Sequence, residues 1–163
     1  MSAFYGTTAG ADAYHSERGN AGWDGTEGVK TAALVRASQY LDTHYTFAGE
    51  AATAGQVREW PRSGVIYRGE TLASDTIPAA VEMAAYEAAL RELETPGSLS
   101  PDFTEAGAIK RVKKGVGPLA KEIEYTTAGS AYAAKPVIAM IDGLLRPLLK
   151  AGRGSVNFPV IRG

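Results

Sequence analysis

The 163-residue chain contains no cysteine and only two histidines, and these scarcities exclude several kinds of site. Without thiols, the chain can form neither disulfide bonds nor thiolate metal sites. His15 and His44 are too few for a histidine-rich metal site. No apolar run approaches the roughly 20 residues of a transmembrane helix. The N-terminus has no basic start followed by an apolar segment, so we expect no signal peptide and a cytoplasm-like compartment.

The sequence motifs of common enzyme classes are missing as well. The chain has no GxSxG nucleophile elbow, no GxxxxGK[ST] phosphate-binding loop and no HExxH metal motif. The segment GVGPLAK at 115–121 lacks the Gly-Lys-Ser/Thr that a phosphate-binding loop needs. No pair of carboxylates stands out for acid–base chemistry. We therefore predict that the protein is not an enzyme and uses no metal or cofactor.

Charge is present in quantity, but it is unevenly distributed along the chain. The formal net charge is -1, yet residues 1–107 hold 7 Lys/Arg and 15 Asp/Glu, a balance of -8. Residues 108–163 hold 10 Lys/Arg and 3 Asp/Glu, a balance of +7. If the fold keeps these parts separate, the molecule is a dipole suited to contact with copies of itself or with a partner. If the two parts interleave, their charges neutralise locally.

Hydrophobic periodicity predicts a mainly α fold, a small helical bundle with an inserted β-hairpin and an extended C-terminal tail. The length and an apolar content of 45% fit one helical domain over residues 1–150, followed by the tail at 151–163. The alanine-rich third helix is apolar around most of its circumference, so we expect it at the centre of the bundle or against a neighbouring subunit. Of the four expected helices, three lie at about 11–18, 78–94 and 136–150, and the second begins after a cap at Asp24 or Thr26 and ends at His44.

Local signals predict breaks between and within these helices. Thr53 and Gln56 form a capping-box pattern that predicts one or two helical turns. Pro61 pushes the residue before it out of helical geometry, which ends those turns in a fixed corner. We expect Trp60 to fill a gap between helices at this corner. Pro147 predicts a kink in the fourth helix or its early end.

A dense run of positive charge, KRVKK at 110–114, lies within a predicted β-hairpin at about 108–125. In the register that pairs Val112 with Ile123, one face holds two cross-strand charge pairs, Arg111–Glu124 and Lys113–Glu122. Each such pair contributes roughly 0.2–1 kcal/mol. The other face gathers three lysines with apolar residues: Lys110, Lys114, Lys121, Val112, Val116, Leu119, Ile123 and Tyr125.

The basic hairpin has three interpretations. It is a solvated, self-paired edge, or it packs against a neighbouring subunit, or it contacts nucleic acid. Single-strand binders interleave cations with aromatic residues, but no aromatic occurs between 104 and 124, and Phe103 and Tyr125 only flank the run. The chain also lacks a recognition-helix, zinc-finger or RNP-type signature. The candidate subunit or DNA contacts are Lys110, Arg111, Lys113, Lys114 and Lys121.

The C-terminal segment 146–163 carries four cations and no acid. Within it, Val156, Phe158 and Val160 alternate with other residues in a strand pattern that has no local partner. Such a tail orders by adding to another subunit's sheet or by lying in a groove; the alternative is a disordered end. The candidate partner-binding residues are Lys150, Arg153, Val156, Phe158, Val160, Ile161 and Arg162.

Six segments, in this order and spacing, resemble a family of tailed-bacteriophage head–tail connectors, also called adaptors or head-completion proteins. The segments are ADAYHSERGNAGW (11–23), RASQYLDTHY (36–45), WPRSGV (60–65), IPAAVEMAAYEAALREL (77–93), VKKGVGPLAKEIEY (112–125) and IDGLLRPLL (141–149). Relatives in this family are often labelled DnaT-like single-stranded DNA-binding proteins. The resemblance covers roughly residues 11–149.

The resemblance implies a structural virion protein of the phage neck, assembled in the host bacterial cytoplasm. It implies a homo-oligomeric ring, expected to be a dodecamer, that lies beneath the portal, extends the DNA channel and docks the stopper or tail. The implied partners are copies of the chain, the portal protein, a stopper or tail-completion protein and genomic DNA passing without sequence specificity, with no membrane. The portal would bind the C-terminal candidate residues.

The alternative is a single-stranded DNA-binding protein of phage replication or packaging. Its contacts would be Lys110, Arg111, Lys113 and Lys114, together with Tyr125. Because such binding neutralises phosphates, its affinity would fall steeply with salt.

Overall fold

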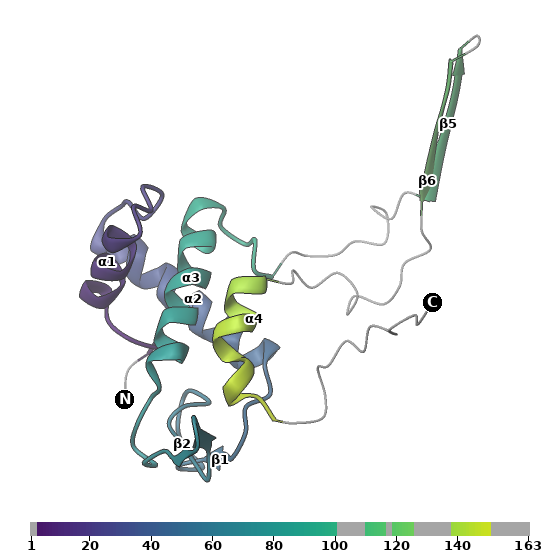
Figure 1. The fold of residues 1–163 in the computed structure, drawn as a ribbon. Helices are drawn as coiled ribbons and strands as arrows, with labels where there is room; N and C mark the ends of the chain where they lie inside the picture. The colour runs from purple at the N-terminus through teal and green to yellow at the C-terminus, as the bar shows by residue number, and fades with distance from the viewer. Residues whose placement is uncertain (1–2, 101–109, 117–118, 126–137, 151–163) are drawn as a thin grey trace.

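The computed structural model describes residues 3–100, 110–116, 119–125 and 138–150 (Figure 1). The described part is mainly helical, with small two-stranded antiparallel sheets, which confirms the expected fold class. Its helices are α1 (Thr8–Glu17), α2 (Glu27–His44), α3 (Ala79–Glu94), α4 (Ala139–Leu145) and the 3-10 helix η3 (Arg146–Leu148). Its strands are β1 (Glu50–Ala51), β2 (Arg62–Ser63), β3 (Ile66–Tyr67), β4 (Glu70–Thr71), β5 (Lys110–Val116) and β6 (Leu119–Tyr125). The predicted tail at 151–163 lies outside the described residues.

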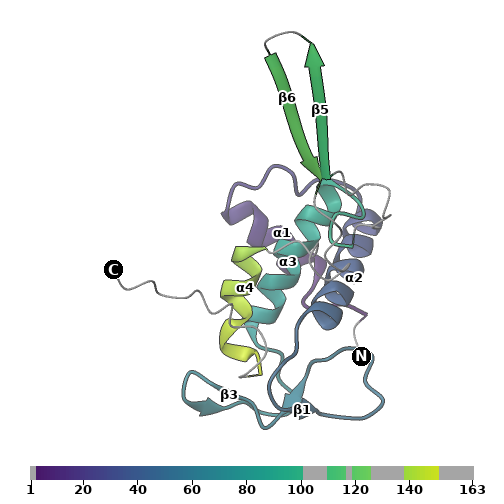
Figure 2. The same ribbon diagram turned by 90° about the vertical axis from the view of Figure 1, so that its right-hand side faces the viewer.

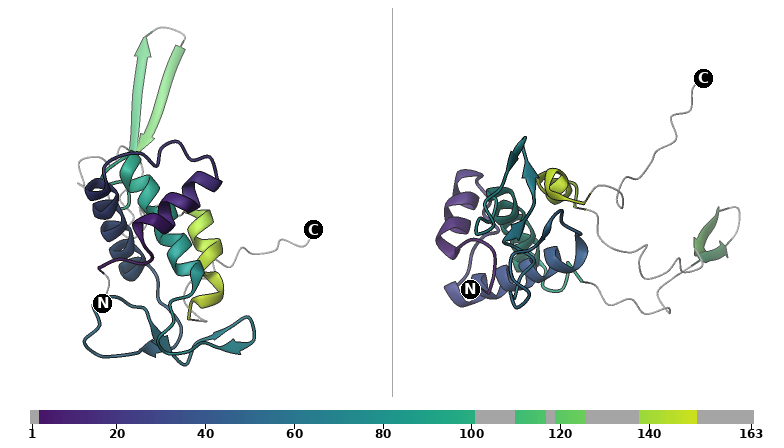
Figure 3. Two further views of the ribbon diagram at one scale, coloured as in Figure 1. Left: turned by 90° about the vertical axis from the view of Figure 1, so that its left-hand side faces the viewer. Right: turned by 90° about the horizontal axis from the view of Figure 1, so that it is seen from below.

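Helix α3 is the central element of the bundle, as its apolar circumference predicts. It packs against α1, α2 and α4 (Figure 1 and Figure 3). Close approach is possible because its neighbours meet small side chains, of which Ala84, Ala85, Ala88 and Ala89 are all fully buried. None of the helices in the described part of the chain is long and apolar enough to cross a bilayer.

Two of the predicted helix breaks have different outcomes. Helix α4 ends at Leu145 and the chain tightens into η3 around Pro147, which confirms the predicted early end. No helix forms at Thr53 and Gln56, so that prediction is wrong. The Gln56 amide oxygen does accept from the Thr53 N–H at 3.0 Å, half of a capping box. Because the Gln56 amide nitrogen also donates to the carbonyls of Arg58 and Pro61, its side chain stabilises an irregular loop instead.

Trp60 packs in the hydrophobic core, as expected. It is 2% exposed, and its ring meets that of Phe47 edge-on with centroids 5.6 Å apart. The peptide bond between Trp60 and Pro61 is cis. The corner that this segment makes brings β2 alongside β1, with Ala51 opposite Arg62.

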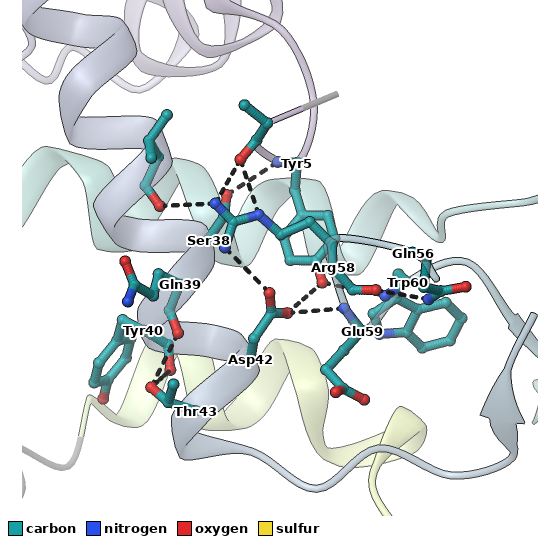
Figure 4. A network of polar contacts seen from close by, with 12 residues as sticks. Tyr5, Ser38, Gln39, Tyr40, Asp42, Thr43, Gln56, Arg58, Glu59 and Trp60 are labelled. Atoms are coloured by element: carbon teal, nitrogen blue, oxygen red, sulfur yellow. Dashed lines mark hydrogen bonds and ion pairs between the residues drawn. The ribbon is translucent and has the colours of Figure 1, made fainter. Parts of the chain in front are cut away.

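A buried polar network joins the N-terminal segment, α2 and this corner (Figure 4). The Tyr5 hydroxyl donates to a carboxylate oxygen of Asp42 and accepts from the Trp60 N–H at 3.2 Å. Arg58 lies 3.3 Å from the same carboxylate and also donates to the Ala3 carbonyl. Burial raises the pKa of Asp42 above its ordinary value. The hydroxyl of Tyr5 is thus the point at which three separate segments meet.

Replacing Tyr5 with phenylalanine should therefore destabilise the protein. The Tyr5→Phe change leaves the buried Trp60 N–H without an acceptor, which costs about 1–3 kcal/mol of unfolding free energy. Urea unfolding followed by circular dichroism measures the loss. Tyr67→Phe is the matched control, because no hydrogen bond of its hydroxyl is present in the described residues, and it should stay within about 0.5 kcal/mol of wild type. Equal unfolding midpoints for both variants and wild type would contradict the network's role.

Candidate functional site

The hairpin of β5 and β6 carries the cations singled out in the sequence. The two strands pair antiparallel with Val112 opposite Ile123, which confirms the predicted register. Within the described residues the two strands contact each other and no other helix or strand. Among the described elements, the hairpin is thus held by its own cross-strand pairs.

Pleating divides these cross-strand pairs between two faces, because successive residues of a strand point to opposite sides. What we call the charge-paired face holds Arg111 opposite Glu124, Lys113 opposite Glu122, and Gly115 opposite Ala120. What we call the lysine face holds Lys110 opposite Tyr125, Val112 opposite Ile123, Lys114 opposite Lys121, and Val116 opposite Leu119.

The two faces differ in charge. The charge-paired face has two cations and two anions at opposed positions, so its charges balance. The lysine face has three cations and no acid. Lys114 and Lys121 occupy directly opposed positions, and like charges so placed destabilise a strand pair. An anion bound between Lys114 and Lys121 would relieve that repulsion, so the lysine face is the better anion-binding surface of the two.

Of the predicted partner-binding residues at the C-terminus, only Lys150 lies in the described part of the chain. Lys150 follows η3 and is exposed, and its backbone N–H donates to the Thr46 carbonyl at 3.0 Å. Six candidate residues of the tail lie outside the described residues: Arg153, Val156, Phe158, Val160, Ile161 and Arg162. The structure thus brings the five hairpin cations into one element and does not test the tail.

Most cations of the helical bundle are already engaged. Five ion pairs link Lys30 to Asp12, Arg36 to Glu92, Arg58 to Asp42, Arg62 to Glu59, and Arg91 to Glu87. Two of these pairs satisfy carboxylates that are themselves buried, those of Glu87 and Glu92. These cations serve the bundle's own acids, so they are poor candidates for binding an external anion.

His15 is a buried histidine with a structural role. It is 1% exposed, with Nε2 3.2 Å from the Tyr86 carbonyl and Nδ1 3.0 Å from the Asn20 amide nitrogen. These partners fit a neutral ring that donates from Nε2 and accepts at Nδ1. Burial lowers the pKa of His15 below its ordinary value, which favours the same neutral form.

Two cavities lie in the part of the chain that the structure describes. One of about 280 Å³ is lined by Arg91, Glu94, Thr95, Ser98, Leu99 and Ile138. Another of about 140 Å³ lies between the N-terminal segment and the Trp60 corner. Within the described part of the chain, no group of three or more His, Asp or Glu side chains is arranged to hold a metal ion. That the protein is not an enzyme stays a prediction.

Comparison with known proteins identifies a family. A family model described as "Putative DnaT-like ssDNA binding protein" matches residues 4–163. No curated protein and no solved structure matches the chain. Because the match covers nearly the whole chain, the chain belongs to this family.

This match corrects the interpretation of the six-segment resemblance. The head–tail connector assignment, with its virion neck and homo-oligomeric ring, is wrong, and the single-stranded DNA-binding alternative is the one supported. Among the expected partners, DNA is supported by the family. The protein partners, namely further copies, a portal and a stopper, depended on the connector interpretation and have no other support.

The register of the hairpin is testable by charge reversal at two adjacent positions. Lys114→Glu should stabilise the hairpin by roughly 0.2–1 kcal/mol, because it converts an opposed like-charge pair into an ion pair with Lys121. Lys113→Glu should destabilise it by a similar amount, because it faces Glu122. Amide hydrogen exchange of β5 and β6 in each variant measures both effects. A shift of the pairing by one residue would move both lysines away from these partners, and equal effects would contradict the register.

The burial of neutral His15 predicts a pH-dependent stability. An unfolded histidine has a pKa of about 6.5, and the folded value is lower, so the native state binds fewer protons between the two values. Stability is therefore complete above about pH 6.5 and falls as the pH drops toward the folded pKa. Urea midpoints from pH 8 to 5 should show this decline in wild type and in the control His44→Gln, but a weaker one in His15→Gln. An NMR titration that gave His15 a pKa above 6.5 would refute the account.

Proposed function

We propose that this chain, which belongs to the family of DnaT-like single-stranded DNA-binding proteins, binds single-stranded DNA through the lysine face of the β5–β6 hairpin. The observation that carries the proposal is the register, which gives one face of the hairpin three cations and no acid. The balanced charges of the other face make it the less favourable surface for a polyanion.

The spacing of the lysines suits a phosphate backbone rather than a single small anion. Lys110 and Lys114 are four residues apart on β5, which corresponds to about 13 Å at 3.3 Å per residue. Lys114 and Lys121 occupy directly opposed register positions, so they can bind one phosphate together. Lys110 is then available for another phosphate further along the strand. Binding would release counterions and weaken with salt.

The same face supplies apolar groups for the bases. Tyr125 lies opposite Lys110, and Val112 lies opposite Ile123. Stacking of a base on an aromatic side chain is worth about 1–3 kcal/mol and tolerates any base, because every base has a π-face. Sequence-specific readout requires side chains that hydrogen-bond base edges. Lysines and apolar residues in this arrangement favour binding without sequence preference.

Two double variants with equal charge change test the proposal. Lys110→Gln/Lys114→Gln removes two lysines of the lysine face, and Arg111→Gln/Lys113→Gln removes two cations of the charge-paired face. The first should weaken binding to oligothymidylate roughly tenfold and reduce the slope of log K against log salt by about 1.4, the value for two phosphates on a single strand. The second should have a smaller effect on both. Fluorescence anisotropy over a series of NaCl concentrations measures affinity and slope.

Three outcomes would overturn the proposal. One is equal losses from the two double variants, since the effect would then reflect net charge alone. Another is tighter binding of duplex than of single-stranded DNA by wild type. The last is no detectable binding of single strands by wild type at low salt. Circular dichroism of each variant verifies that the helical bundle is intact.

A further inference from the structure

Four cations of the bundle form no ion pair within the described residues, and three of them also donate no side-chain hydrogen bond there. Of the Lys and Arg side chains in residues 3–100 and 138–150, five form ion pairs, and Arg18 donates to the Tyr14 carbonyl. Arg68, Arg146 and Lys150 have neither an ion pair nor a hydrogen bond from their side chains within those ranges. All three are exposed. Since the other six cations of these ranges are engaged by an acid or a carbonyl, these three are the ones available to bind an external anion.

These three cations gather at one end of the bundle. Arg68 lies in the turn that joins β3 to β4, and β3 packs against η3, which begins at Arg146. Lys150 follows two residues after η3 and is held there by its backbone bond to Thr46. Figure 2 and Figure 3 show β3 beneath the C-terminal end of α4. We call the set Tyr67, Arg68, Arg146 and Lys150 the bundle-end surface.

Arg68 occupies a backbone conformation that disfavours it. Its φ is 54°, in the left-handed region, and Gly69 follows with φ 88°. Tyr67 pairs with Glu70, so Arg68 and Gly69 form a two-residue hairpin turn in which both positions favour glycine or asparagine. The side chain makes no hydrogen bond that would offset the strain within the described residues. Strain of this kind at an exposed turn points to a functional role for the side chain.

The neighbours of Arg68 suit a nucleobase. Its guanidinium carbon lies 5.1 Å from the centroid of the Tyr67 ring, which is partly exposed. Ile66, the preceding residue, is 68% exposed. A guanidinium stacked on an aromatic ring, beside an apolar side chain, is a surface on which bases stack. One acid, Glu70, lies opposite Tyr67 in the register and opposes the binding of phosphate here.

We propose that the bundle-end surface is a second contact site for single-stranded DNA. The phosphates bind Arg68, Arg146 and Lys150, and a base stacks on the Tyr67–Arg68 pair. This inference rests on the proposed function and adds a separate surface to the hairpin. A strand long enough to reach both surfaces is bound more tightly than a short one, because the second contact is then intramolecular.

The test compares two arginines that each lie over a tyrosine. Arg68→Gly removes the charge and relieves the left-handed strain, so its Tm should equal or exceed that of wild type while its affinity for long oligothymidylate falls roughly threefold. Arg18→Gly is the matched control, because Arg18 lies 3.5 Å over the Tyr14 ring at the C-terminal cap of α1, and it should leave affinity unchanged. Arg146→Gln and Lys150→Gln, added to Arg68→Gly, should deepen the loss. Glu70→Gln should strengthen binding.

The dependence on oligonucleotide length separates this inference from the function on which it rests. Wild type should bind long oligothymidylate more tightly than short, and Arg68→Gly should reduce that difference. If the hairpin variants weaken binding but Arg68→Gly behaves as Arg18→Gly does, the bundle-end inference fails and the proposed function stands. If wild type binds no single strand of any length, both fail. Equal affinity for polyglutamate and oligothymidylate would indicate a general polyanion surface and overturn the base-stacking part.

Discussion

The alternation of side chains along paired β-strands is the constraint on which the functional account depends. Register pairs Lys113 with Glu122 and, one residue further, Lys114 with Lys121. Two neighbouring lysines in the same run are therefore in opposite electrostatic situations, one balanced and one repelled. A shift of a single residue would exchange the faces. The capacity of the hairpin to bind an anion thus depends on which residues are paired across the strands. It does not follow from the number of positive charges in KRVKK.

In the helical bundle, by contrast with the lysine face, the buried charged side chains have partners of opposite charge. Tyr5, Asp42 and Arg58 tie the N-terminal segment to α2 and the Trp60 corner, and the two buried acids of α3, Glu87 and Glu92, have their own cation partners. Besides its paired cations, the described part of the chain therefore holds two groups of cations without an acid partner, one on the lysine face and one on the bundle-end surface. Five acids of residues 1–107 form ion pairs within the bundle, and the net charge of the whole chain is only -1, so the unpaired cations are the groups that the chain offers to a polyanion.

Much of the fold could be predicted from the sequence, because its signals are local and consistent. The apolar circumference of 78–94 indicated the central helix, and pairing Val112 with Ile123 gave the register of the hairpin. Gln56 was misread because its side chain has three backbone partners in an irregular loop, which no periodicity reveals. The Arg68–Gly69 turn was missed because Arg-Gly is not one of the dipeptides that signal a two-residue hairpin. The connector interpretation failed because the order of segments identifies relatives and not an activity.

The most direct measurement of the central claim is ultraviolet cross-linking of the full chain to oligothymidylate, followed by mass spectrometry of the cross-linked peptides. The account predicts that cross-links occur in the hairpin and fall at positions of the lysine face, with Tyr125 foremost. Bound DNA that cross-links elsewhere in the chain and leaves the peptides of 110–125 unmodified would contradict it.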